Sequence, residues 1–130
     1  MKFTERKIEI AKKLNELEIQ WQPQAGQYVF DLKGIIEKSS PFQAGVYFIL
    51  DIKHFLRRAG SVEDIKAAMC WLPLWEDCRE ILKSLQVPWN RVENRLNNIS
   101  AFENDRERLV VYEMILEELQ QNSNQKYYKK

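Results

Sequence analysis

Strand-like periodicity in this 130-residue chain is confined to one short block, residues 27–50. Every second residue from Tyr28 to Leu32 is aromatic or leucine, which is typical of a strand with one buried face. After a turn at Lys33-Gly34, Ile35–Lys38 predicts a second strand, and the apolar run Val46–Leu50 predicts a third, buried one. We therefore expect a small antiparallel three-stranded meander within about residues 27–50.

Helix periodicity fills the chain on both sides of this block. Thr4, Asp51 and Ser61 are placed to cap the first turns of three of these helices. Helices are expected over residues 4–20, 51–59, 61–69, 73–85, 89–99 and 105–121. Met69–Leu72 is expected to end in an extended conformation, because Pro73 disfavours helical geometry at the residue before it.

Strands that cluster in one block and helices that cluster elsewhere predict the α+β class rather than alternating βαβ units. About five or six helices would then cover one small meander. We find no internal repeat and no linker, so we predict a single globular domain over residues 1–121. Residues 122–130 are polar and basic, and we expect them to form a disordered tail.

The charges of the chain are dense but balanced. Twenty Lys and Arg residues face 19 Asp and Glu residues, and the net charge is +1, so a nucleic acid would need a local basic patch. Residues 1–20 contain no continuous apolar segment, and the longest apolar run, Val46–Leu50, is far too short to span a membrane. We expect a cytoplasmic protein with no membrane partner, in which Cys70 and Cys78 stay reduced.

The residues that could support catalysis or cofactor binding are few. The four glycines are isolated, so the chain contains neither a P-loop nor a dinucleotide-binding fingerprint. His54 is the single histidine and could share a helix face with Asp51, but no further ligand is placed beside them by spacing. A serine or cysteine nucleophile would have to use that same His54 as its imidazole base. We therefore expect no metal, no cofactor and no enzymatic activity.

A nucleic-acid-binding module is one alternative. Two arginines and two asparagines fall on one face of the helix expected over residues 89–99, opposite its apolar seam. Arginine and asparagine are the side chains that pair with two atoms of guanine and adenine edges. The candidate contacts on this face are Arg91, Asn94, Arg95 and Asn98. The balanced overall charge makes this alternative less favoured.

Four tryptophans in a small chain point to contacts with another macromolecule, because tryptophan is enriched at binding hot spots. The candidate interface residues are Trp71, Leu74, Trp75 and Trp21. The leading hypothesis is a small non-enzymatic protein with an adaptor or regulatory role, whose partner is another protein or a second copy of itself. A further alternative is a small-molecule-binding domain or enzyme with a pocket against the 27–50 sheet, lined by Tyr28, Tyr47 or His54.

Overall fold

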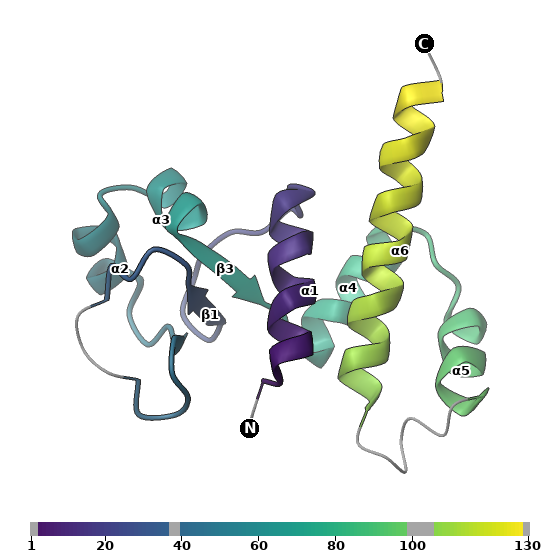
Figure 1. Ribbon diagram of the computed structural model, residues 1–130, viewed down its shortest axis with the longest axis horizontal. Helices are drawn as coiled ribbons and strands as arrows, with labels where there is room; N and C mark the ends of the chain where they lie inside the picture. The colour runs from purple at the N-terminus through teal and green to yellow at the C-terminus, as the bar shows by residue number, and fades with distance from the viewer. Residues whose placement is uncertain (1–2, 37–39, 99–105, 129–130) are drawn as a thin grey trace.

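The computed structural model describes residues 3–36, 40–98 and 106–128, with side chains described as far as Asn122 (Figure 1). Within these ranges the chain forms six helices and one three-stranded antiparallel sheet, which confirms the predicted α+β class. The elements in chain order are α1 (Glu5–Glu16), β1 (Tyr28–Asp31), β2 (Val46–Phe48), α2 (Ile52–Ala59), α3 (Val62–Ala68), β3 (Met69–Leu72), α4 (Trp75–Ser84), α5 (Trp89–Asn98) and α6 (Glu107–Tyr128).

The sheet has the strand order β2-β1-β3, so its third strand comes from a part of the chain outside residues 27–50. Ile35 and Ile36 lie outside any strand, because their backbone N–H groups donate to the Asp31 carboxylate at 3.1 and 2.9 Å and close a local turn. Residues 37–38 of that expected strand lie outside the described ranges. All four residues of Met69–Leu72 are buried, and this segment pairs with β1 instead.

Different parts of the chain cover the two faces of the sheet. Tyr28, Phe48 and Leu72 are direct cross-strand partners and therefore share one face. The N-terminal segment and α1 lie on this face, where the Phe3 and Tyr28 ring centroids are 5.5 Å apart. On the opposite face, Trp71 of β3 stacks on Trp21. Figure 1 shows α1 passing across β3, with α6 beside it and α2 and α3 at the other end of the molecule.

The junction between β3 and α4 is fixed by α6. Tyr112 of α6 is fully buried, and its hydroxyl donates to the Pro73 carbonyl at 2.5 Å. This bond satisfies a phenol that would otherwise cost free energy in the core. Asp77 adds a second constraint, because its carboxylate accepts the Leu74 N–H at 2.9 Å and fixes the start of α4. The path of residues 71–75 into α4 is therefore set by both side chains.

The helix starts follow the sequence closely. The side chains of Thr4, Asp51 and Ser61 accept backbone N–H groups in the first turns of α1, α2 and α3, which confirms the three predicted caps. The helix ends follow it less closely. The last helix was expected to end near Gln121, and α6 continues to Tyr128. The single domain and the disordered tail stay predictions. None of the helices in the described ranges combines the length and the apolar character needed to cross a membrane.

Candidate protein-binding cleft

The four interface candidates divide into two buried and two partly exposed residues. Trp21 and Trp71 are 8% and 7% exposed, and their rings stack with centroids 5.8 Å apart. This pair fills the space behind the sheet and presents almost no area to a partner. Leu74 and Trp75 are partly exposed at the start of α4, so of the four candidates only these two offer contact area.

Trp89, which the sequence did not single out, is the most exposed tryptophan. Its exposed fraction is 51%, and its ring meets that of Trp75 edge to face, with centroids 6.5 Å apart. The guanidinium carbon of Arg79 lies 5.8 Å from the Trp89 ring centroid, within the range of a cation–π contact. Trp89 is therefore held in place by neighbours from α4 while much of its ring stays open to solvent.

Trp75 and Trp89 form one side of a cleft of about 550 Å³ between α4, α5 and the first turn of α6. Leu96 of α5 completes its apolar surface, and charged and amide side chains line the remainder. The lining residues are Trp75, Trp89, Glu93, Leu96, Asn97, Glu107 and Arg108. Among the described residues that line the cleft, none is a serine, a cysteine or a histidine. The described lining thus combines an apolar surface with charged and amide groups.

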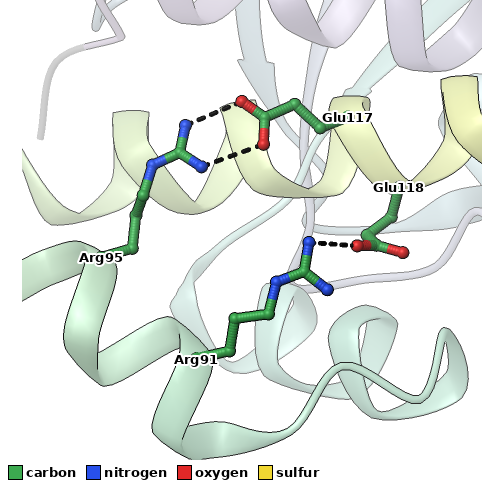
Figure 2. A network of polar contacts seen from close by, with 4 residues as sticks. All are labelled: Arg91, Arg95, Glu117 and Glu118. Atoms are coloured by element: carbon green, nitrogen blue, oxygen red, sulfur yellow. Dashed lines mark hydrogen bonds and ion pairs between the residues drawn. The ribbon is translucent and has the colours of Figure 1, made fainter.

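The position of α5 depends on two ion pairs with α6 (Figure 2). Arg95 donates from both terminal nitrogens to Glu117, at 3.0 and 2.7 Å, and Arg91 lies 2.6 Å from a Glu118 oxygen. The hydrogen bonds from Arg95 lower the pKa of Glu117, and the same bonds raise the pKa of Arg95. Beneath these pairs, Val92 is buried and anchors the helix to the core. The pairs and this anchor together fix one wall of the cleft.

The same ion pairs bear on the nucleic-acid alternative. Arg91 and Arg95 are both paired with acidic residues of α6, and because both terminal nitrogens of Arg95 bond Glu117, Arg95 could pair with a base edge only by giving up that carboxylate. Asn94 and Asn98 are exposed on α5, and neither lines the cleft. All four residues thus lie on α5, and two of them, Arg91 and Arg95, attach α5 to α6 through ion pairs.

Arg108 brings a positive charge to the cleft. Its guanidinium carbon lies 5.4 Å from the Phe3 ring centroid, and no described carboxylate is ion-paired with it. Burial, followed by repulsion from this guanidinium, lowers the pKa of Lys7. Because Glu93 and Glu107 also line the cleft, charges of both signs are available at its rim.

A second cavity lies against the sheet, where the small-molecule alternative expected one. It has a volume of about 330 Å³, and Tyr47, Asp51 and His54 are among its lining residues, whereas Tyr28 is not. The imidazole of His54 is exposed and lies edge to face with Phe55 at 5.9 Å. In the described ranges, no three or more His, Cys, Asp or Glu side chains are grouped so that they could hold a metal ion.

Comparison with known proteins gives no family assignment. No protein-family model matches the chain, and neither a curated protein nor a solved structure is found to be similar to it.

Proposed function

We propose that this protein binds another protein through the cleft between α4, α5 and α6, as a small non-enzymatic adaptor or regulatory module. The observation that carries the proposal is Trp89, which is 51% exposed and held edge to face against Trp75 at the cleft. A large aromatic side chain that is already ordered contributes contact area at little cost in conformational entropy. Such residues account for much of the free energy at protein interfaces.

The shape and chemistry of the cleft suit a protein partner. Three helices contribute to it, and its apolar surface lies beside glutamate, asparagine and arginine side chains. An apolar centre with a polar rim is the usual pattern of a protein interface. We propose that a partner inserts one or two apolar side chains beside Trp75 and Trp89, and that its polar groups meet Glu93, Asn97 or Arg108.

We also propose a cytoplasmic location. Cys70 and Cys78 are both unpaired thiols, and persistent free thiols are typical of reducing compartments. The net charge of +1 gives no general attraction to nucleic acids or anionic membranes, which supports a partner recognised by shape and local contacts.

Photo-crosslinking with a matched pair of positions on α5 tests the proposal. Asn97 lines the cleft, whereas Asn94 is exposed on the same helix and does not line it. A photoreactive benzoylphenylalanine is placed at one position or the other, and each protein is irradiated in an extract of the cells that naturally make this chain. We expect a discrete crosslinked protein from position 97 that is absent at position 94 and lost when Trp89→Ala is added. Equal products from both positions, or none from position 97, would overturn the proposal.

A further inference from the structure

A second surface, formed by β2, the residues beside it and α2, exposes apolar side chains at the opposite end of the molecule from α5 (Figure 1). Leu50 and Phe42 are 80% and 58% exposed. Large apolar side chains are normal at isolated surface positions, but here one of them borders a cavity of about 330 Å³. We call this the α2 surface; its cavity is lined by Ile36, Pro41, Tyr47, Phe48, Leu50, Asp51, His54 and Phe55.

The ionised side chains of α2 are all basic. The segment Ile52–Ala59 contains lysine and two arginines and no acidic residue. Asp51 precedes the helix, and its carboxylate accepts the Lys53 N–H at 2.9 Å as the N-terminal cap. Within the described ranges, neither Lys53 nor Arg57 is ion-paired with a carboxylate. The α2 surface therefore combines an apolar hollow with the positive charges of Lys53 and Arg57, which no described carboxylate pairs.

The cations and the apolar surface are interleaved. Lys53, Leu56 and Arg57 together line a shallow hollow on α2, so an apolar contact there lies between two positive charges. His54 borders the deeper cavity on the same helix. A ligand that filled both hollows would place its own polar groups beside Lys53, His54 and Arg57.

From this arrangement we propose that the α2 surface docks an acidic amphipathic segment of a partner protein. Apolar side chains of that segment fill the cavity between Phe48, Leu50 and Phe55, and its carboxylates pair with Lys53 and Arg57. Complementary charge steers such an encounter and selects against basic segments, while the apolar contacts supply most of the affinity. This surface is separate from the cleft at Trp89, so it stands or fails independently of the function proposed above.

Lipid and nucleic acid fit this surface less well. The apolar surface is concave, and a membrane interface fills hollows poorly, whereas individual side chains can enter them. Nucleic-acid bases require open aromatic platforms for stacking. The most exposed apolar residue here is instead an aliphatic side chain, Leu50, and the Phe42 ring meets that of Tyr28 edge to face, with centroids 6.3 Å apart.

The test uses two synthetic helical peptides with the same leucine face, one carrying glutamate and the other lysine on its polar face. Each is labelled with fluorescein and titrated against the full chain, and amide chemical shifts of the protein map the contact. We expect the glutamate peptide to bind about tenfold more tightly than the lysine peptide. The shift changes should centre on residues 47–57 and leave Trp89 unaffected.

Two double charge reversals serve as the test variant and its matched control. Lys53→Glu with Arg57→Glu should abolish the preference for the glutamate peptide. Arg6→Glu with Lys83→Glu changes the net charge equally at exposed positions outside this surface, and should preserve the preference. Leu50→Ala should weaken binding of the glutamate peptide severalfold without changing the fold.

Vesicles with an anionic lipid and a single-stranded oligothymidylate are titrated in parallel. Tighter binding to either probe through the same residues would overturn the proposal in favour of a membrane or nucleic-acid surface. Equal affinity for both peptides, or shift changes located elsewhere, would overturn it as well.

Discussion

Arg95 and Glu117 join α5 to α6 through two parallel hydrogen bonds of 3.0 and 2.7 Å (Figure 2). Paired bonds of this kind fix orientation as well as distance. Because α5 supplies Trp89 and Leu96 to the cleft, this pair positions the proposed binding surface without touching its occupant.

A double-mutant cycle should assign the Arg95–Glu117 pair a modest coupling. Both side chains are more than one-third exposed, so solvent screening limits the expected coupling to about 0.5–1 kcal/mol of unfolding free energy. The variants are Arg95→Ala, Glu117→Ala and the double mutant, measured by urea denaturation. The exposed pair Lys83–Glu80, at 3.8 Å, serves as the control and should show a coupling close to zero. Similar values for both pairs would contradict a special role for Arg95.

The same pair predicts that the stability of the folded protein depends on pH. The pKa of Glu117 is lowered in the folded protein, mainly by the hydrogen bonds from Arg95. Its stabilising contribution is therefore fully present above the pKa of a glutamate in the unfolded chain, about 4.3, and is lost as the pH falls through the lower folded-state pKa. The destabilisation caused by Glu117→Gln should be largest near neutral pH and vanish in strong acid. A destabilisation that stayed constant with pH would show that charge is not involved.

Gly45 should tolerate a side chain far less well than Gly34. Both have positive φ angles, +80° and +65°, but a Cβ at Gly45 would lie 2.7 Å from Cε2 of Phe30, whereas Gly34 has open space. We expect Gly45→Ala to lower the unfolding free energy by about 2–3 kcal/mol and Gly34→Ala by about 1 kcal/mol. Thermal and urea unfolding measure the loss of unfolding free energy in each variant. Adding Phe30→Leu to Gly45→Ala should restore part of the lost unfolding free energy. If it restored none, the strain would not come from contact with the Phe30 ring.

The two thiols should be unreactive in the folded protein. Burial raises the pKa of Cys70 to about 12, and burial together with the nearby Asp77 charge raises that of Cys78 to about 12. At about pH 8 the thiolate fraction would be on the order of 10⁻⁴, so iodoacetamide should react only as fast as the chain opens. Mass spectrometry follows the adducts, with urea-unfolded protein as the reactive control. Fast labelling of Cys78 in the folded chain would reopen the possibility of a cysteine site.

Acrylamide quenching should identify Trp89 as the main accessible fluorophore. Trp21 and Trp71 are buried in their stack, and Trp75 is partly covered. Trp89→Phe should therefore remove most of the quenchable emission, whereas Trp71→Phe should leave it in place. If Trp89→Phe left the quenching constant unchanged, the cleft would be covered in solution and could not receive a partner.

Features set by local sequence were predictable. Asp51 and Ser61 cap the helices that they were expected to cap, because capping involves only the next three residues. The third strand depends on pairing across the chain. Met69–Leu72 was recognised as extended, but nothing in its sequence identifies β1 as its neighbour. Ile35 and Ile36 do not form the strand expected there, because their backbone N–H groups donate to the Asp31 carboxylate and close a local turn instead.

The candidate site was less predictable than the fold, because exposure depends on how the helices pack. Trp89 lies on the same apolar seam as Val92, yet Val92 is buried and Trp89 is half exposed. Trp89 is the first residue of α5, where its ring lies beside Trp75 and Arg79 of α4. The sequence pattern predicted that Arg91 and Arg95 share one face of this helix, but it could not show that both pair with acidic residues of α6.

The most direct measurement uses the partner protein that is crosslinked from position 97. Calorimetry gives the Kd of that partner for the unmodified chain and for its variants. A hot spot of about 2 kcal/mol corresponds to roughly 30-fold in Kd, so Trp89→Ala should weaken binding by at least that factor. Leu32→Ala, at an exposed apolar position directly after β1, should leave Kd unchanged. If a folded Trp89→Ala variant bound within threefold of the unmodified chain, the cleft would not be the binding site.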